Sequence, residues 1–518
     1  MPYLPMPLSR KMLQYTILLV LLMIAFPIVK SFPTTASDSL VVSGVFTTYA
    51  NEKSKHLVRI KQADGSKFGT DYISTLLPPF DSGKGAHAGS IHVLESSEDE
   101  SRFLIGGNLV KYNGTPVGRI ALLDMTGKLD ASFAAGTGFN ATVQVIKRDP
   151  WNPDKYYVGG EFTEYDGLPA PGLARINSDG SMDMDFAGVG VQLVTYDDID
   201  EEFISNPGRV TTIAFHKSMG LVCFGGSFNY FNEWPHNNIA CIKKAGLSPI
   251  AEVFDVIDPF VNSLGFFELP PGADDFSATS AYVDEVDKIK IDEANDKIYI
   301  SGQFNTYANR DASGQFTPAD AKSTGNLCRL NIDGTFDQSY PYEGILAKRM
   351  DFLFDEPNNA VVIGAGKYDA DGNGIGEMTA YASLIKFDRD SKALLSEFAV
   401  TEDILNSSPV PYYDGGVHSK EMRHGTGEWS DYIYLLQGNG KSEANGDGYS
   451  DYGLSKQPPL IRINLLTGEV DPTFPFGPID AKEAAAFIVL KESDYGLFDW
   501  SIDLIFEYFG IDPETFFE

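Results

Sequence analysis

The sequence predicts an all-β protein built from seven small antiparallel sheets, and three observations support this prediction. First, the pattern Gly-Gly-x-Phe, followed closely by a tyrosine, recurs along the chain. Second, each copy is followed by a strand-like segment such as Leu173-Ala174-Arg175-Ile176. Third, an Asp-Gly turn ends most copies, which is a strong hairpin signal. Repeats of this size are typical of a β-propeller, in which radially arranged sheets bury one another's faces.

The clearest copy of the repeat spans residues 157–186. All copies align on the second glycine of the pair, and these glycines are Gly44, Gly107, Gly160, Gly226, Gly302, Gly366 and Gly440. Glycine pairs inside strands indicate close backbone approach, and the recurring Phe indicates a layer packed between sheets. In the fourth copy we assign the repeat's tyrosine to Tyr230. Residues 37–490 therefore predict a single seven-bladed β-propeller in place of the three or four domains that a length of 518 suggests.

The two ends of the repeat region are predicted to meet. The first copy lacks the strand that precedes Gly-Gly in the other copies, and an apolar segment at residues 485–490 follows the last copy. We predict that this segment contacts residues 40–46, which would remove an exposed sheet edge.

Residues 491–518 form an acidic, amphipathic C-terminal segment. Helical spacing separates its apolar residues Phe498, Ile502, Ile505 and Phe509. We therefore expect a short helical tail. A cap packed on the propeller is the favoured interpretation, and a partner-binding helix is the alternative.

The full repeat reads Gly-Gly-x-Phe-x-x-Tyr-x-Gly and then Ile-Ala-Arg-Leu-Asn-x-Asp-Gly-Ser-x-Asp-x-x-Phe. It resembles the delta-60 repeat family of bacterial and phage-associated propeller proteins. The resemblance is close at residues 157–186, and weaker copies extend it over most of residues 40–476. It implies a propeller fold and an extracellular or structural setting, and it implies no particular activity.

Residues 1–36 are predicted to be a secretory signal peptide. Arg10 and Lys11 precede an apolar run, and small residues follow this run up to Ala36. An uncleaved membrane anchor is the alternative, because Met12–Val29 is nearly long enough to span a bilayer. We expect a protein that is secreted or held at the cell surface, with no membrane span once the signal is removed.

The charge of the chain is strongly negative, since 40 Lys and Arg stand against 72 Asp and Glu. The formal net charge is −32. Such a surface repels phosphate backbones and anionic lipid, so we expect no nucleic-acid partner.

The chain has three cysteines, Cys223, Cys241 and Cys328. The first two fall on neighbouring strands of one repeat, so a disulfide between them is possible. The favoured interpretation is that all three are small, buried, apolar side chains.

Two loops resemble the calcium loops of integrin-type (FG-GAP-like) propellers, Asp-x-Asn/Asp-Gly-Asp/Asn-Gly-x-x-Asp. Residues 366–377 and 440–451 align without gaps, and each follows a glycine-rich strand. Oxygen-bearing side chains fall at positions 1, 3, 5 and 9, glycines at 4 and 6, and a backbone carbonyl is available at position 7, which suits Ca²⁺. The predicted ligands are Asp369, Asp371, Asn373, Ile375 and Glu377 in one loop and Glu443, Asn445, Asp447, Tyr449 and Asp451 in the other. The alternative is a pair of polar turns on exposed hairpins.

The sequence contains no GxSxG, Walker or HExxH motif. We therefore predict a non-catalytic binding or adhesion module, stiffened by two calcium ions, whose partner is a surface glycan or protein. Long insertions at residues 191–209, 255–287 and 400–430 would carry the contact. One alternative is a structural component of a virion or cell-surface assembly. A second alternative is a propeller enzyme acting on polysaccharide, which would require His, Arg and Tyr to converge at the channel mouth.

Overall fold

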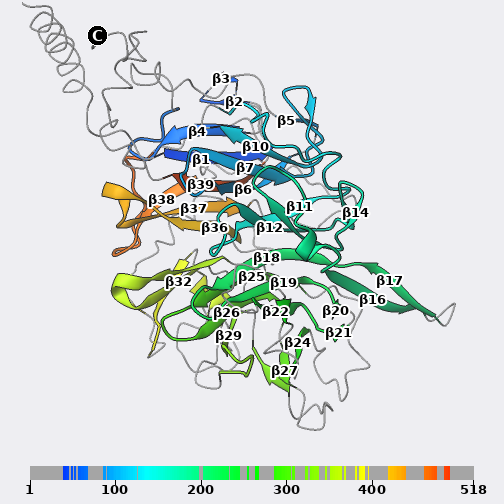
Figure 1. The fold of residues 1–518 in the computed structure, drawn as a ribbon. Helices are drawn as coiled ribbons and strands as arrows, with labels where there is room; N and C mark the ends of the chain where they lie inside the picture. Colours follow the sequence, from blue (N-terminus) through cyan, green and yellow to red (C-terminus); the bar gives the residue numbers. More distant parts are fainter. Residues whose placement is uncertain are drawn as a thin grey trace, which may run out of the picture.

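The computed structural model describes residues 39–490 with gaps. The longer gaps are residues 68–85, 198–201, 245–253, 256–262, 268–284, 310–320, 338–344, 347–350, 369–379, 391–394, 396–417, 439–459 and 475–482. The described chain consists of β-strands and three short 3-10 helices, so the all-β prediction is confirmed (Figure 1). None of the described helices is long and apolar enough to cross a membrane. The predicted signal peptide (1–36) and helical tail (491–518) lie outside the described residues.

Each copy of the sequence repeat forms one antiparallel sheet of three or four strands, which we call a repeat sheet and number by copy. In order, the repeat sheets are β39-β1-β4 (Glu483–Leu490, Ser39–Val45, Leu57–Lys61), β6-β7-β10 (Ile91–Ser96, Arg102–Gly107, Ile120–Asp124), β11-β12-β15 (Val143–Arg148, Lys155–Gly160, Leu173–Asn177), β18-β19-β22-β23 (Arg209–His216, Leu221–Ser227, Ile239–Lys244, Phe254–Asp255), β25-β26-β29 (Glu285–Asp292, Lys297–Gln303, Leu327–Asn331), β31-β32-β35 (Phe352–Asp355, Ala360–Gly364, Leu384–Asp388) and β36-β37-β38 (His418–His424, Tyr432–Gly438, Leu460–Asn464).

The predicted contact between the two ends of the repeat region is confirmed. Strand β39 pairs antiparallel with β1 over its whole length, with Phe487 opposite Val42. A further contact joins the first and seventh repeat sheets, because the Gln62 side-chain amide donates to Thr426 Oγ1 at 2.8 Å and its carbonyl accepts from the Thr426 N–H at 3.3 Å. The first and last described strands therefore belong to one sheet.

The first strand of each repeat sheet as written above lies beside its counterpart in the next sheet, and we call these seven strands the inner strands. Contacts join β39 to β6, β6 to β11, β11 to β18, β18 to β25, β31 to β36 and β36 to β39. An ion pair joins Lys290 of β25 to Asp351, the residue immediately before β31. Each repeat sheet thus contacts the next one near its inner strand.

The glycine pair is required by close packing on two sides, as the sequence predicts. A Cβ added to Gly160 would lie 2.2 Å from the backbone oxygen of Thr142, and one added to Gly159 would lie 2.7 Å from Val210 of the next inner strand. The repeat's Phe is buried in the layer between the sheets, as at Phe162. A larger residue at either glycine would force neighbouring strands apart.

The long connections of all repeat sheets leave from one end, which we call the long-connection end. At this end the inner strand begins, and the second strand of the sheet ends; we call this second strand the Gly-Gly strand. Residues 304–326, for example, leave β26 at this end and lead to β29. At the opposite end the links are short, as in residues 293–296 between β25 and β26. This arrangement follows from antiparallel pairing, which brings alternate links to the same end.

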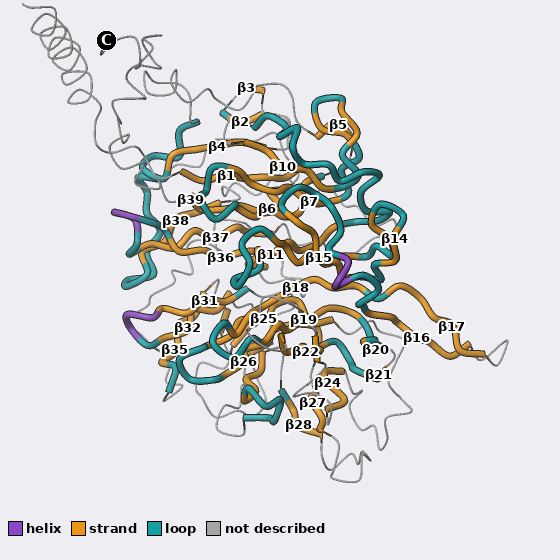
Figure 2. The backbone as a smooth tube through the Cα atoms, in the orientation of Figure 1, coloured by secondary structure: helices purple, strands orange, loops and turns teal. Residues whose placement is uncertain are grey.

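Small accessory sheets form from the long connections, and strands β5, β14, β16, β17, β20 and β21 of these sheets lie at the right in Figure 2. They are β2-β3 (Thr48–Tyr49, Glu52–Lys53), β5-β8-β9 (Ala86–Ala88, Lys111–Tyr112, Thr115–Pro116), β13-β14 (Glu164–Tyr165, Leu168–Pro169), β17-β16-β20-β21 (Glu202–Pro207, Val191–Asp197, Tyr230–Phe231, Trp234–Pro235), β24-β27-β28 (Ser263–Phe267, Thr306–Asn309, Ala321–Ser323) and β30-β33-β34 (Ile345–Leu346, Lys367–Tyr368, Ala380–Tyr381). The insertion at residues 191–209 forms the projecting hairpin β16–β17 (Figure 1).

The repeat's tyrosine links the accessory layer to the Asp-Gly turn. Its hydroxyl donates to the carbonyl of the turn's glycine in four copies, through the pairs Tyr49–Gly65, Tyr112–Gly127, Tyr165–Gly180 and Tyr307–Gly334. In the fourth copy the assignment of this position to Tyr230 is wrong. The buried Phe231 occupies it, five residues after Gly226, while Tyr230 is only half-buried.

Candidate functional site

In each repeat sheet, one residue of the Gly-Gly strand lies opposite one residue of the third strand. The side chains of this pair differ in type from sheet to sheet. From the first sheet to the seventh the pairs are Val41–Arg59, Leu104–Leu122, Tyr157–Arg175, Cys223–Cys241, Tyr299–Arg329, Val362–Lys386 and Tyr434–Arg462. The same structural position is therefore filled by apolar, ionic or covalent links.

In the fourth repeat sheet this link is a disulfide, so the favoured interpretation of the cysteines is wrong for two of the three. Cys223 and Cys241 are directly opposed across β19 and β22, with their Cα atoms 4.0 Å apart, and their sulfurs are bonded. The strand register, which the sequence could not fix, brings the two thiols together. Cys328 is buried and free, as predicted, and burial raises the pKa of its thiol.

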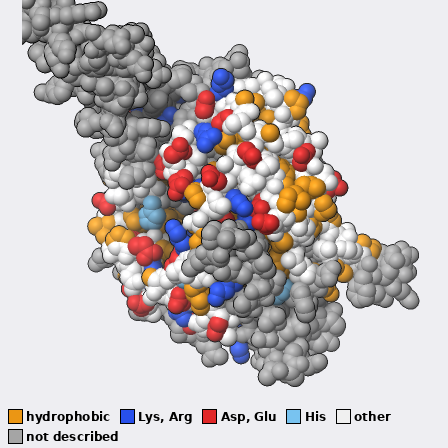
Figure 3. Space-filling model, viewed as in Figure 1, with side chains coloured by type: hydrophobic (Ala, Val, Ile, Leu, Met, Phe, Trp, Pro, Cys, Tyr) orange, Lys and Arg blue, Asp and Glu red, His pale blue; other side chains and the backbone are white. Residues whose placement is uncertain are grey.

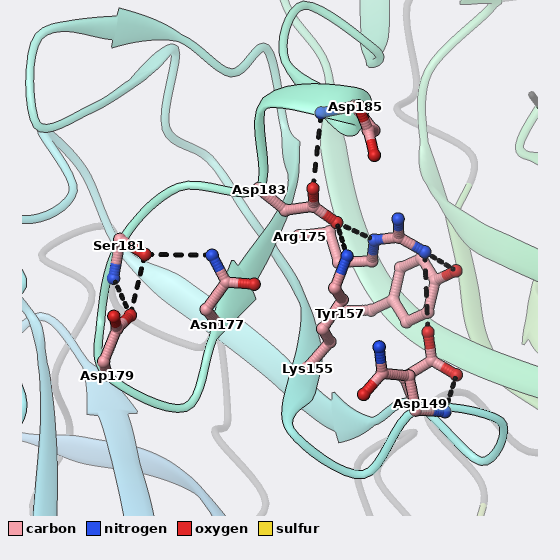
Figure 4. A network of polar contacts seen from close by, with 10 residues as sticks. Asp149, Lys155, Tyr157, Arg175, Asn177, Asp179, Ser181, Asp183 and Asp185 are labelled. Carbon is pink, nitrogen blue, oxygen red and sulfur yellow. Dashed lines mark hydrogen bonds and ion pairs between the residues drawn. The ribbon is translucent and has the colours of Figure 1, made fainter. Parts of the chain in front are cut away.

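In the third repeat sheet the same position holds a fully buried arginine (Figure 4). Arg175 donates through Nε to Asp183 at 2.5 Å and through Nη1 to the hydroxyl of Tyr157 at 3.3 Å. Asp149 lies 3.5 Å from Nη1, and Lys155 reaches Asp183 at 2.9 Å. A buried guanidinium is tolerated only with such partners, because an unpaired buried charge costs several kcal/mol.

The carboxylates that pair with Arg175 and Arg462 stay ionised. Burial alone would raise the pKa of Asp183, but the hydrogen bond from Lys155 and the charge of Arg175 hold it below its usual value. Asp471 behaves alike, since burial is outweighed by hydrogen bonds from Thr473 and the charge of Arg462. The bond from Arg175 to Asp183 ties β15 to the segment that follows its Asp-Gly turn. The guanidinium of Arg175 is buried, so the network offers no surface to a ligand.

A different charged group lies on the inner strands and is reached by solvent. We call it the inner-strand charge cluster, and it consists of Glu95, Lys147, Lys288, Lys290, Asp351, Glu421 and Arg423. Its members come from five different repeat sheets. Alternate residues of a strand share a face, so Lys288 projects to the same side of β25 as Lys290, and Glu421 to the same side of β36 as Arg423.

Three ion pairs hold the cluster together. Lys290 Nζ lies 2.9 Å from Asp351, Arg423 lies 2.5 Å from Glu421, and Lys147 lies 3.9 Å from Glu95. The side chains of Lys290 and Arg423 are each 29% exposed, while that of Asp351 is only 3% exposed. The cations of the cluster therefore meet solvent, whereas the carboxylate of Asp351 lies beneath them.

The same carboxylates satisfy backbone groups on the free edges of neighbouring inner strands. Asp351 accepts the N–H of Met422 at 2.7 Å, and Glu421 accepts that of Phe487 at 3.1 Å. Glu95 accepts the N–H of Arg148 at 3.1 Å. The N–H groups at an unpaired strand edge would otherwise lack an acceptor, so each carboxylate also links two adjacent repeat sheets.

Lys288 and Lys147 both lie within electrostatic reach of Lys290. Burial lowers the pKa of Lys290, Asp351 opposes this effect, and the neighbouring charges of Lys288 and Lys147 add to it. Burial alone would raise the pKa of Asp351, but Lys290 and Lys288 hold it below its usual value. Lys288 makes no hydrogen bond or ion pair with any residue that the structure describes.

The predicted calcium ligands, Asp369 to Glu377 and Glu443 to Asp451, lie outside the described residues. The strands that flank them are described. One loop connects β33 to β34 and the other connects β37 to β38, so both start from the long-connection end. Within the described part of the chain, no group of three or more His, Cys, Asp or Glu side chains is placed to hold a metal ion.

The comparison with protein families matches the second and third repeats. Residues 102–133 and 153–186 match the model of a domain of unknown function, DUF5122, which is described as a β-propeller. No curated protein matches the sequence. Among solved structures, the crystal structure of AztD from Citrobacter koseri is similar with a TM-score of 0.37 and 11% identity, and the apo form of the same protein with a TM-score of 0.35 and 10% identity. Each comparison covers 88% of this chain and 98% of the other.

Proposed function

We propose that the protein is an exported, non-catalytic β-propeller of seven blades that binds a surface glycan or protein through its long-connection end. The observation that carries this proposal is the common origin of the long connections and accessory sheets at one end of the repeat sheets. Connections on a rigid scaffold are the usual carriers of binding residues.

The blade number and family are supported by the repeat itself. Seven repeat sheets correspond to the seven sequence copies, and β39 supplies the inner strand of the first sheet. The match of residues 102–133 and 153–186 to a β-propeller family supports the same fold. Assignment to the delta-60 repeat family rests on the sequence pattern of these copies.

Export is supported by the disulfide between Cys223 and Cys241, because such bonds persist mainly in oxidising compartments. It agrees with a secretory signal at residues 1–36. Two calcium ions, bound by the loops within residues 366–377 and 440–451, would stiffen connections that start from the proposed binding end. The C-terminal segment at residues 491–518 would then form a helical cap.

Blocking each end of the molecule in turn tests the proposal. Glu164→Cys places a thiol on the accessory hairpin β13–β14 at the long-connection end, and Leu466→Cys places one on an exposed turn at the opposite end. Each full-length variant is coupled to a maleimide polymer and applied to an array of immobilised bacterial, plant and animal polysaccharides and to cell-surface protein extracts. We expect the uncoupled protein to bind, the polymer on Glu164→Cys to abolish binding and the polymer on Leu466→Cys to leave it unchanged.

The matched pair makes the outcome decisive, because both variants carry the same polymer and differ only in its position. Loss of binding with the polymer on Leu466→Cys alone would place the contact at the other end. Absence of binding by the uncoupled protein to every probe would overturn the binding function.

A further inference from the structure

The inner-strand charge cluster carries more positive than negative charge, although the whole chain is strongly acidic. Its four cations face three carboxylates, whereas the chain has 40 basic and 72 acidic residues. On the face shown in Figure 3, acidic and basic side chains are interspersed. The cations of the cluster repel one another, so their close placement in an acidic protein needs a physical explanation.

Lys288 is the cation that creates the excess. Lys147, Lys290 and Arg423 each have a carboxylate partner, at 3.9, 2.9 and 2.5 Å. Lys288 has no ion pair or hydrogen bond among the described residues and is only half-buried. It sits beside Lys290 on one face of β25, so the two ammonium groups repel each other, and Asp351, whose charge reaches both, is paired with Lys290.

The surroundings of Lys288 are rigid and open to water. Lys147 comes from β11 and Lys290 from β25, strands that are paired along their length within their sheets. The side chain of Lys147 is 37% exposed and that of Lys290 is 29% exposed. A small solute from solution can therefore meet ammonium groups that are already positioned, which reduces the entropy lost on binding.

We propose that Lys288, together with Lys147 and Lys290, binds a small oxyanion through a carboxylate or phosphate group. Charge-assisted hydrogen bonds from ammonium groups are among the stronger polar contacts, and a bound anion would offset the repulsion between the lysines. Asp351 remains the partner of Lys290, which keeps that ammonium in place. The oxyanion is either a free ion or the acidic group of a sugar, and this site acts independently of surface binding at the long-connection end.

Calorimetric titration of the full-length protein tests the proposal. Inorganic phosphate and galacturonate are the probes, and galactose is the neutral control that lacks the carboxylate. We expect phosphate or galacturonate to bind, galactose not to bind, and the affinity to fall as sodium chloride is added. Binding of phosphate alone identifies a free ion, and binding of galacturonate alone identifies an acidic sugar.

Variants tie the binding to the cluster. Lys288→Gln should weaken the affinity for the binding probe about tenfold or more, by removing one charged contact. Lys217→Gln changes an exposed lysine in the turn after β18 and should leave the affinity unchanged. Because Lys288 has no described polar partner, its replacement should preserve the melting temperature. If Lys288→Gln does not fold, Lys147→Gln provides the same test.

Two results would overturn the proposal. One is no heat of binding with phosphate or galacturonate at roughly millimolar concentration, where even weak complexes form. The other is equal affinity in the wild type, Lys288→Gln and Lys147→Gln. Neither result depends on the polymer-blocking experiment, so failure of the oxyanion site and failure of surface binding are distinguishable.

Discussion

Cys223 and Cys241 are joined at the position where the neighbouring third sheet pairs Tyr157 with Arg175. A covalent bond and a buried ionic network thus perform the same task, which is to link the Gly-Gly strand to the third strand of a repeat sheet. Each is a separate contribution to stability and can be removed alone.

Reduction of the disulfide should destabilise the protein. The bond joins residues 18 apart, and closing a loop of this size is worth about 3 kcal/mol through restriction of the unfolded chain. Denaturant unfolding with and without a phosphine reductant measures the difference. The double variant Cys223→Ala, Cys241→Ala should unfold identically in both conditions, and a reductant effect that persisted in it would refute the assignment.

Replacement of Asp183 should be costly, because it leaves the buried guanidinium of Arg175 with weaker partners. Asp183→Asn is expected to lower the free energy of unfolding by about 3 kcal/mol. Asp185→Asn, two residues further and exposed, is the matched control and should change little. Equal stability of the two variants would show that the network of Figure 4 contributes nothing.

The decrease in the free energy of unfolding at acid pH should depend on Asp183. The pKa of Asp183 is lowered in the folded protein, so its contribution is complete above the unfolded value of about 3.9 and is lost as the pH falls through the folded value. Between about pH 4 and pH 2, the unfolding free energy of the wild type should therefore fall more steeply than that of Asp183→Asn. Parallel pH profiles would contradict the shift.

Asp351 should stabilise the junction between the fifth, sixth and seventh repeat sheets. Its carboxylate pairs with Lys290 and accepts the N–H of Met422, so Asp351→Asn exchanges an ionic partner for a neutral one beside a half-buried lysine. We expect a loss of about 2 kcal/mol in chemical unfolding. Asp154→Asn, an exposed turn residue, is the control, and an equal loss there would remove the special role of Asp351.

The fold was predictable where the sequence repeats, and the inner-strand charge cluster was not. The Gly159-Gly160 pair indicates close packing, because a larger side chain would not fit at either position. The apolar segment at residues 485–490 could be assigned to the sheet edge that lacked a partner. The cluster was missed because its residues come from five sheets, and their convergence depends on three-dimensional packing. The one local signal was Lys288-x-Lys290, two positive charges on the same face of a strand, alternating with the apolar residues Ile289 and Ile291.

The pairing of β39 with β1 should be essential to the integrity of the fold. Ending the chain after residue 482 removes β39, with the buried Phe487 and Ile488, and exposes the edges of β1 and β6. We expect a melting temperature lower by on the order of 5–10 °C and concentration-dependent association. Ending the chain after residue 490 removes only the tail and is the control. A monomer of unchanged stability after removal of β39 would refute the role of this strand.

Calcium should stabilise the full-length protein through the two predicted loops. With a Kd of roughly 10⁻⁴–10⁻³ M, calcium at about 2 mM should add about 0.6–2 kcal/mol per site relative to EDTA. Asp371→Ala combined with Asp447→Ala should abolish the rise in melting temperature. Asp179→Ala alters an Asp-Gly turn in which the carboxylate bonds Ser181, and it should lower stability while keeping the full calcium response. A wild type with the same melting temperature in calcium and EDTA would make both loops ordinary polar turns, and the long-connection end would then have to hold its partner without metal.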